Sequence, residues 1–221
     1  MLGSSSTLDE IITAWKARKR EQSTQVLAAS IQTIKLLAQG QPVTKQQLRS
    51  QVSLSEDEVN RYIDNLEQNG CEFDDKGQLV GNALSLTPSP YQMRINGQTL
   101  FAWCALDTLF LPACVGQVAQ VASTCQVTKI PITLTVTPKG VESLDPLTTV
   151  LSIVVPGITP SCDLKAKTGP QGPVCSTMHF FGSKEAATPW LKDNPGLAIL
   201  SIDEAWQLTY AVWIEPLQQL S

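Results

Sequence analysis

The sequence predicts an α+β protein, in which a helical front segment precedes a mixed α/β core with mainly antiparallel strands. Apolar residues recur at helical spacing up to about residue 68, whereas short alternating segments bounded by Gly, Pro and Asn dominate the rest. With 221 residues, of which 43% are hydrophobic and 16% charged, the chain can bury a sizeable core. These observations indicate a folded globular chain of one large or two small domains.

The front of the chain is predicted to form helices. Periodic apolar residues indicate helices over 7–20 and 25–39, and Gly40 stops the second. Thr44 is a plausible N-cap of a short helix, and Ser53 or Ser55 caps the next one. That helix is expected to end at 69–70.

A strand, a turn at Lys76 and Gly77, and a second strand are expected over 71–80. Three helices followed by a small hairpin form the winged-helix pattern, whose common function is DNA binding. The candidate recognition helix, 55–68, carries Glu56, Asp57, Glu58, Asp64 and Glu67 against the single Arg61. Because a groove-reading helix needs cations to neutralise phosphates, we expect a structural or covering role and no nucleic-acid partner.

The expected domain division follows from these patterns. Residues 1–24 form an N-terminal helix or extension, 25–87 the winged-helix-like domain, and 88–221 the core. Within the core, one clear signal is the alternation of apolar residues with threonines over 132–137, which predicts a half-buried strand. Further core strands are expected at 91–95, 117–123, 150–155, 177–181 and 197–200.

Connections and caps in the core are also indicated. Asn96 and Gly97 are a strong hairpin turn leading into an expected central helix. A loop rich in Pro, Gly and Lys is expected over 159–173, just before Cys175, and a short helix over 186–191. Ser201 and Glu204 have the spacing of a capping box for the last helix.

The most apolar long run, 99–112, carries one thiol and one carboxylate. If it is helical, Cys104 and Asp107 share a face, and Pro112 ends the helix. A helix that is apolar nearly all round should be buried, so the pKa of Asp107 should be raised beside a thiol one turn away. A core helix with a satisfied carboxyl and a core cysteine explains the same pattern.

Net charge and cysteine usage restrict the function. A net charge of −4 gives no general attraction for nucleic acid or anionic membranes, and no segment reaches about 18 consecutive apolar residues. No apolar signal segment follows the N-terminus. The cysteines form no C-x-x-C pair and are expected to be reduced thiols of a cytoplasmic protein; they are Cys71, Cys104, Cys114, Cys125, Cys162 and Cys175.

These thiols could belong to four kinds of functional site. A structural zinc site needs four ligands at paired spacings, and Cys175 with His179 supplies half of one. A Cys–His hydrolase would use His179, the only histidine, which lies among apolar residues in an expected strand. A disulfide oxidoreductase would need C-x-x-C. The fourth is a soft-metal site of two separated thiols and a carboxylate, because thiolates prefer soft metals.

Several motifs resemble those of the alkylmercury lyase (organomercurial lyase) family. The resemblance extends from about Gln25 to Trp206 and is most specific in W-C-A-L-D-T and in the later cysteine ahead of H-F-F. The motifs are Leu100-Phe-Ala-Trp-Cys-Ala-Leu-Asp-Thr-Leu109, Val118-Ala-Gln-Val-Ala-Ser-Thr-Cys125, Ile132-Thr-Leu-Thr-Val-Thr-Pro138, Cys175-Ser-Thr-Met-His-Phe-Phe181, Gly196-Leu-Ala-Ile199 and Asp203-Glu-Ala205.

The resemblance implies an enzyme of mercury detoxification that cleaves the carbon–mercury bond by protonolysis, giving a hydrocarbon and Hg(II). It maps the catalytic residues onto Cys104, Asp107 and Cys175, which would also hold the Hg(II) product. No resident cofactor is implied. External thiols would support turnover, and Hg(II) would pass to cellular thiols or a mercuric reductase.

Other positions follow from the same resemblance. It maps a structural cysteine onto Cys125, and Ser176 stands where some members have a second cysteine. The remaining thiols, Cys71, Cys114 and Cys162, match no family motif and are treated as ordinary cysteines. The front domain is expected to cover the core. A non-catalytic winged-helix sensor or binding protein for mercury remains the alternative, and such a sensor would bind operator DNA.

Overall fold

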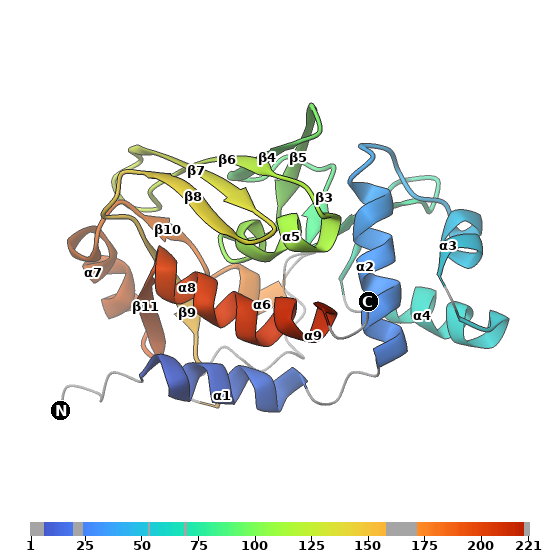
Figure 1. Cartoon of the computed structure of the whole chain (residues 1–221), viewed down its shortest axis with the longest axis horizontal. Coiled ribbons are helices and arrows are strands. Elements are labelled where there is room, and N and C mark those ends of the chain that lie inside the picture. Colours follow the sequence, from blue (N-terminus) through green and yellow to red (C-terminus); the bar gives the residue numbers. More distant parts are fainter. Residues whose placement is uncertain (1–6, 20–23, 53, 69, 158–171, 219–221) are drawn as a thin grey trace.

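The computed structural model describes residues 7–19, 24–52, 54–68, 70–157 and 172–218 (Figure 1). These residues form a mixed α+β fold with one eight-stranded and one three-stranded sheet, and all their strand pairs are antiparallel. The predicted fold class, α+β with mainly antiparallel strands, is confirmed. Within the described residues, no helix is both long and apolar enough to cross a membrane.

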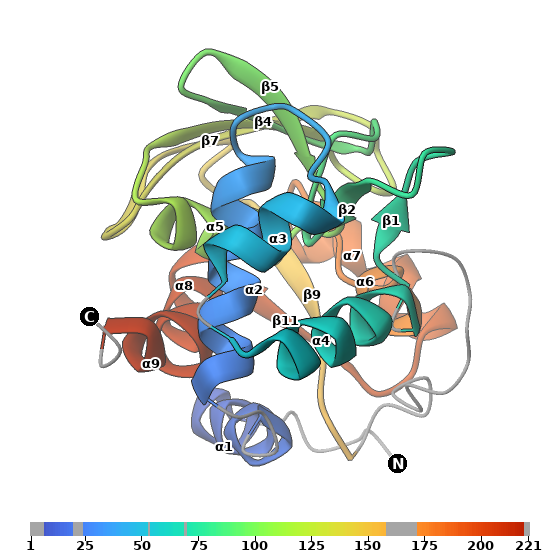
Figure 2. The ribbon, with the colours of Figure 1, turned by 90° about the vertical axis from the view of Figure 1, so that its right-hand side faces the viewer.

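The helices expected in the front segment are present. They are α1 (Leu8–Lys19), α2 (Thr24–Leu37), α3 (Lys45–Gln51) and α4 (Glu56–Gln68). Thr44 caps α3 in a reciprocal capping box with Gln47, and Gly40 adopts a φ of 75° shortly after α2. Helices α2, α3 and α4 lie at the opposite end of the molecule from α7 (Lys184–Asp193) (Figures 1 and 2).

The large sheet has the order β1-β2-β3-β5-β4-β6-β7-β8. Its strands are β1 (Glu72–Phe73), β2 (Leu79–Asn82), β3 (Leu84–Ser85), β4 (Tyr91–Ile95), β5 (Gln98–Ala102), β6 (Ala119–Thr124), β7 (Pro131–Thr137) and β8 (Gly140–Asp145). The hairpin expected over 71–80 therefore joins the same sheet as the core strands. Strand β8 was not expected, because its residues are mostly exposed or half-buried without clean alternation.

The helix expected over 99–112 is wrong in its first half. Residues 98–102 form β5, which pairs with β4 across a turn where Asn96 and Gly97 both have positive φ. Strand β5 lies between β3 and β4, and its Leu100 and Ala102 side chains are fully buried. A short apolar run fits a buried strand as well as a buried helix. Here the run forms a strand because it pairs with β3 on one side and β4 on the other.

The helix begins later than expected and passes through the proline. Helix α5 spans Asp107–Val115, contains Pro112, and ends at Gly116 with a φ of 75°. Proline removes one backbone hydrogen bond inside a helix. Here Pro112 is buried in a nearly all-apolar helix, so the packing of α5 offsets that loss.

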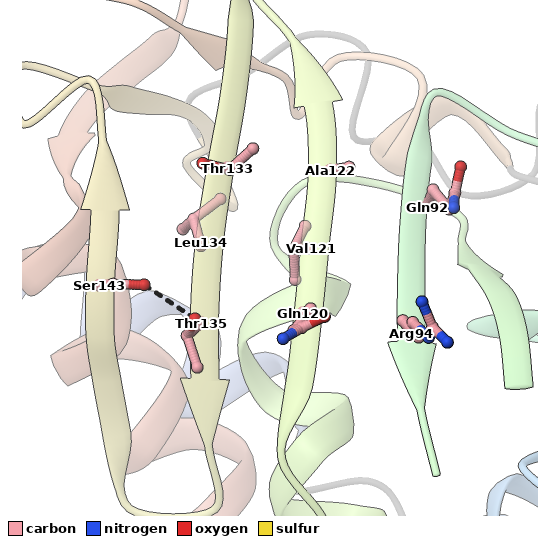
Figure 3. Close-up of a pocket in the computed structure, with 9 residues that line it drawn as sticks. All are labelled: Gln92, Arg94, Gln120, Val121, Ala122, Thr133, Leu134, Thr135 and Ser143. Carbon is pink, nitrogen blue, oxygen red and sulfur yellow. Dashed lines mark hydrogen bonds between the residues drawn. The ribbon is translucent and has the colours of Figure 1, made fainter. Parts of the chain in front are cut away.

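The outward face of the large sheet is polar. In β7, Ile132, Leu134 and Val136 are buried as the alternation predicted. A shallow hollow of about 320 Å³ lies on the sheet (Figure 3) and is lined by Gln92, Arg94, Gln120, Val121, Ala122, Thr133, Leu134, Thr135 and Ser143. This lining holds no thiol, carboxylate or imidazole side chain.

The C-terminal part forms the small sheet, with order β10-β9-β11, and the remaining helices. Its elements are β9 (Val150–Val154), α6 (Gly172–Cys175), β10 (Phe180–Phe181), α7, β11 (Leu197–Ser201), α8 (Ile202–Thr209), the π-helix η2 (Tyr210–Ile214) and α9 (Glu215–Gln218). The strand expected over 177–181 is shorter, and the expected loop over 159–173 lies outside the described residues up to 171. The capping box of Ser201 and Glu204 is confirmed.

Helix α5 occupies the centre of the molecule. It contacts β7 of the large sheet on one side and α8 and η2 on the other (Figure 1). Helix α1 closes this layer, because the Trp15 indole N–H donates to the Val154 carbonyl at 3.0 Å and its ring lies 5.2 Å from the Trp213 ring. Helix α1 therefore packs against α8 and η2, which in turn contact α5.

Candidate active site

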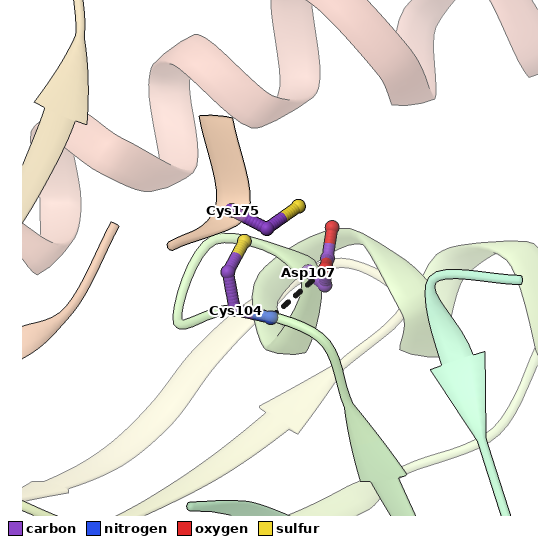
Figure 4. A group of neighbouring side chains, drawn as sticks. All are labelled: Cys104, Asp107 and Cys175. Carbon is purple, nitrogen blue, oxygen red and sulfur yellow. Dashed lines mark hydrogen bonds between the residues drawn. The ribbon is translucent and has the colours of Figure 1, made fainter. Parts of the chain in front are cut away.

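Cys104 and Asp107 are placed by the junction between β5 and α5. The chain bends after Ala102, and Asp107 is the first residue of the helix. The Asp107 carboxylate accepts the Cys104 backbone N–H at 3.0 Å (Figure 4). This bond closes the bend and fixes the carboxylate beside the cysteine, so the two residues meet across a turn instead of along a helix face.

Cys175 reaches the same place from the last residue of α6. Its sulfur, the Cys104 sulfur and an Asp107 carboxylate oxygen all lie within 4.8 Å of one another (Figure 4). Among the described residues, no second group of Cys, His, Asp or Glu side chains has such ligand geometry. The structure thus brings together all three predicted site residues from segments far apart in the sequence.

The surroundings of this group are dry. Cys104 is fully buried and Asp107 is 7% exposed, whereas Cys175 is half-buried. Burial raises the pKa of Asp107 to about 7, although hydrogen bonds from Cys104 act in the opposite direction. Burial, followed by the neighbouring Cys175 and Asp107, raises the pKa of Cys104 well above its usual value. Near neutral pH Cys104 therefore keeps its proton, and the Asp107 carboxyl is partly protonated.

This arrangement has three chemical properties. Two thiols that face one another suit a soft cation, which prefers sulfur ligands. A carboxyl with a pKa of about 7 can both accept and donate a proton at neutral pH. The low exposure of the group limits competition from water.

Comparison with known proteins gives the site its context. The family model described as alkylmercury lyase (MerB) matches residues 84–213. An alkylmercury lyase of Streptomyces lividans is 37% identical over 175 residues, which are 79% of this chain and 77% of that protein. The chain belongs to the alkylmercury lyase family.

Further alkylmercury lyases have similar coverage. The protein of Staphylococcus epidermidis is 35% identical over 79% of this chain and 76% of its own length. The protein of Pseudomonas putida is 32% identical over 81% of this chain and 80% of its own length. The crystal structure of the mercury-bound form of MerB2 superposes with a TM-score of 0.73 at 24% identity, covering 95% of this chain and 99% of that one. That likeness supports the fold.

The other described thiols of this alkylmercury lyase family member, Cys71, Cys114 and Cys125, do not belong to the three-residue group. Cys125 is fully buried, and its sulfur accepts the Thr128 backbone N–H at 3.3 Å. Although burial alone would raise its pKa, hydrogen bonds from Thr128, Gly182 and Val127 bring the pKa below its usual value. Cys71 donates to the Asn82 side chain at 3.7 Å, Cys114 is buried in α5, and Cys162 lies outside the described residues.

His179 has a different position from the one a Cys–His hydrolase would need. Its Nε2 lies 2.9 Å from the Ser176 carbonyl oxygen, and its Nδ1 pairs with the Tyr91 hydroxyl. Both ring nitrogens therefore have hydrogen-bond partners other than the cysteines. Burial lowers the pKa of His179, so the ring is neutral at neutral pH.

Two residues near the site were not singled out from the sequence. Tyr91 was treated only as a strand residue, and Glu72 only as part of a hairpin. The Glu72 carboxylate accepts the Trp103 indole N–H at 2.8 Å, directly beside Cys104 in the chain. The strand of Tyr91 also contains Gln92 and Arg94, and Glu72 is followed by Asp74 and Asp75, so no local pattern marks either residue.

Proposed function

We propose that this chain is an organomercurial lyase that cleaves the carbon–mercury bond of alkyl- and arylmercury compounds by protonolysis. Cys104, Asp107 and Cys175 are its catalytic residues. The observation that carries the proposal is the meeting of two sulfurs and one carboxylate oxygen within 4.8 Å, at a buried position of an alkylmercury lyase family member. The substrate is the organomercurial, and Hg(II) is the product.

The reaction balances with two thiol protons. An organomercurial carried on a small thiolate, R–Hg–SR′, reacts with both cysteines to give R–H, R′SH and Hg(II) bound by two protein sulfurs. One carbon–mercury bond and one mercury–sulfur bond break, and two mercury–sulfur bonds form. One thiol proton goes to carbon and the other to the departing thiolate, and mercury keeps its oxidation state.

Asp107 supplies the route for the proton. Sulfur ligation of mercury pushes electron density toward the bonded carbon and makes it more basic. The Asp107 carboxylate takes a proton from a cysteine as its sulfur binds mercury, and passes it to carbon. The pKa of Asp107 at about 7 makes both steps accessible at neutral pH. The apolar side chains of the same stretch, Phe101, Trp103, Leu106 and Phe110, are the proposed contacts of the organic group.

Hg(II) stays on Cys104 and Cys175, with Asp107 nearby, until other thiols remove it. The acceptors we propose are cellular thiols or a mercuric reductase, and the enzyme needs no resident cofactor. A cytoplasmic location is proposed because none of the five described cysteines forms a disulfide, as expected in a reducing compartment. Cell fractionation would test the location.

For the front of the chain we propose a winged-helix-like domain over 25–87 that covers the core over 88–221, with 1–24 as an extension. The order α2, α3, α4, β1, β2 supports this proposal. The acidic side chains Glu56, Asp57, Asp64 and Glu67 of α4 are exposed, so this face would repel phosphates. Operator DNA binding that changes with mercury would instead favour the sensor alternative. Limited proteolysis would test the domain boundaries.

The decisive experiment is headspace gas chromatography of purified protein with methylmercury or phenylmercury and excess thiol. Methane or benzene should appear with the unchanged protein and with Cys71→Ser, in which the serine hydroxyl can still donate to Asn82. Cys104→Ser and Cys175→Ser should release none. Asp107→Asn should still take up the organomercurial but lose about 10²–10⁴-fold in single-turnover rate, as is typical of general acid–base groups. Cleavage at the parental rate by Cys175→Ser would contradict the two-thiol mechanism.

A further inference from the structure

The position of Cys175 depends on the turn that follows it. Cys175 ends a helix of four residues, and the sheets resume only at Phe180. Between them, the Met178 N–H donates to the Cys175 carbonyl at 3.3 Å and the Thr177 N–H to the Val174 carbonyl at 3.3 Å. We call residues 175–179 the Cys175 turn. Whatever anchors this turn determines where the second sulfur lies.

One anchor is the small sheet. The Ser152 hydroxyl of β9 donates to the Thr177 carbonyl at 2.7 Å and accepts the His179 backbone N–H at 3.0 Å. A second anchor lies next to the first cysteine, because the Ala105 N–H donates to the Met178 carbonyl at 3.1 Å. The backbone of the turn is therefore docked both on β9 and beside Cys104.

A third anchor is a chain of side-chain hydrogen bonds whose direction can be assigned. A carbonyl oxygen only accepts, so the His179 Nε2 near the Ser176 oxygen must carry the proton. Because the ring is neutral, Nδ1 is then an acceptor, and the Tyr91 hydroxyl donates to it. The same hydroxyl also lies 3.3 Å from the Met178 carbonyl oxygen of the turn. The chain runs from Tyr91 of β4 through His179 to the carbonyl next to Cys175.

The packing around this chain leaves it little freedom. Tyr91 is 4% exposed, and its ring lies 6.1 Å from the Phe180 ring. The His179 ring stacks on Tyr91 at 6.3 Å and meets the edge of Trp190 at 4.9 Å. Tyr91 belongs to the large sheet and pairs with Ala102, shortly before Cys104. Both cysteines are therefore connected to the β4–β5 pair. Cys104 is connected through the backbone that follows β5, and Cys175 through the side chains of Tyr91 and His179.

We propose that Tyr91 and His179 are positioning residues that hold the Cys175 turn so that its sulfur faces Cys104. The hydrogen bonds given above for these two side chains join them to one another and to carbonyl oxygens of the turn, so both act through the placement of Cys175. This inference rests on the proposed function, since it concerns capture of mercury by the second thiol. Without these hydrogen bonds, Cys104 and Asp107 keep their geometry, but Cys175 is less well placed and Hg(II) binds more weakly to the two sulfurs.

The test uses Hg(II) alone as the probe, in competition with dithiothreitol, well below the unfolding temperature. Tyr91→Phe keeps the ring and removes the contacts of the hydroxyl with His179 and with the Met178 carbonyl, so it should bind Hg(II) at least about fivefold more weakly. His179→Phe breaks both bonds and should lose more. His179→Gln should recover part of the loss, because its amide N–H can still donate to the Ser176 carbonyl. The matched control is Tyr210→Phe, which removes an exposed hydroxyl bonded only to Gln218 among the described contacts.

A double-mutant cycle separates positioning from general stability. In a Cys175→Ser background, Tyr91→Phe should leave the remaining Hg(II) affinity unchanged. An equal loss in both backgrounds, or unchanged Hg(II) affinity in Tyr91→Phe and both His179 variants, would overturn the proposal. If the unchanged protein holds Hg(II) on both cysteines yet releases no hydrocarbon, the proposed lyase function fails while the positioning result still stands.

Discussion

Asp107 is a carboxyl group in surroundings that penalise its charge. It is 7% exposed, and burial outweighs the hydrogen bonds from Cys104, so its pKa is raised to about 7. A solvent-exposed aspartate would be fully ionised at this pH and would be a poor acid. The same burial that favours proton transfer therefore lowers the stability of the folded protein at high pH.

This linkage gives a prediction for Asp107→Asn. Between the ordinary pKa of 3.8 and about 7, the unfolded chain has an ionised Asp107 while the folded chain keeps it protonated. The folded state binds more protons, so its free energy of unfolding falls as pH rises through this window. From about pH 5 to about pH 8, the parent should lose on the order of 2–3 kcal/mol relative to Asp107→Asn.

Urea unfolding of both proteins across this pH range would measure the effect. His179 has a lowered pKa and contributes a slope of opposite sign, but it is present in both proteins and cancels in the difference. A difference between parent and variant that stays constant with pH would show that Asp107 titrates in its ordinary range.

Cys125 gives a second prediction at the same scale. Its sulfur is fully buried and accepts hydrogen bonds in the turn that follows β6. Cys125→Ala should lower the free energy of unfolding by about 1 kcal/mol or more, with little change in cleavage rate per folded molecule. Urea unfolding and single-turnover assays on one preparation would check both quantities. A well-folded but inactive Cys125→Ala would assign the residue to the chemistry instead.

The β1–β2 hairpin supports the active-site bend from the side of the front segment. Glu72 of β1 accepts the Trp103 indole N–H at 2.8 Å and the Ser85 hydroxyl at 2.5 Å. A hollow of about 460 Å³ lies beside this contact, lined in part by Cys71, Phe73 and Trp103. The hairpin thus positions the residue immediately before Cys104.

Removing this carboxylate should destabilise the junction. Glu72→Ala leaves two donors without their acceptor, and should lower the free energy of unfolding by about 1–3 kcal/mol. Glu72→Gln keeps one acceptor oxygen and should lose less. A double-mutant cycle with Trp103→Phe, followed by urea unfolding, would isolate the indole contact. No coupling energy in that cycle would mean that Glu72 does not hold Trp103.

The active site joins two sheets of the whole molecule. Cys104 follows β5 of the large sheet, whereas the Cys175 turn is docked on β9 of the small sheet. An ion bound to both sulfurs would link the two parts, and the folded state holds the two sulfurs in position for it. Ligands that bind the folded state selectively raise its apparent stability.

One equivalent of Hg(II) should therefore raise the thermal unfolding midpoint of the parent protein. Cys71→Ser should respond like the parent, because it keeps both site thiols. Cys175→Ser should show a much smaller rise, since a single sulfur cannot link the sheets. Differential scanning calorimetry would measure the midpoints, and an equal rise in Cys175→Ser would argue against bridging.

Much of the fold was open to prediction from local signals. The caps at Thr44 and Ser201, the turn at Asn96 and Gly97, and the alternation over 132–137 each use interactions within a few residues. These interactions involve only neighbouring residues, so the sequence predicts them without knowledge of the tertiary structure. The thiols and the carboxyl of the candidate site were identified by the resemblance of short motifs to the alkylmercury lyase family.

Tertiary structure decided what depends on distant partners. Residues 99–102 became a strand because β3 and β4 flank them, and α5 continued through Pro112 because its packing outweighs one lost hydrogen bond. Cys104 lies beside Cys175, and Tyr91 bonds to His179 of the Cys175 turn. No local sequence pattern relates the segments that these contacts join. Residue types set which chemistry is possible in this chain, whereas the approach of its reacting atoms is determined by long-range packing and hydrogen bonds.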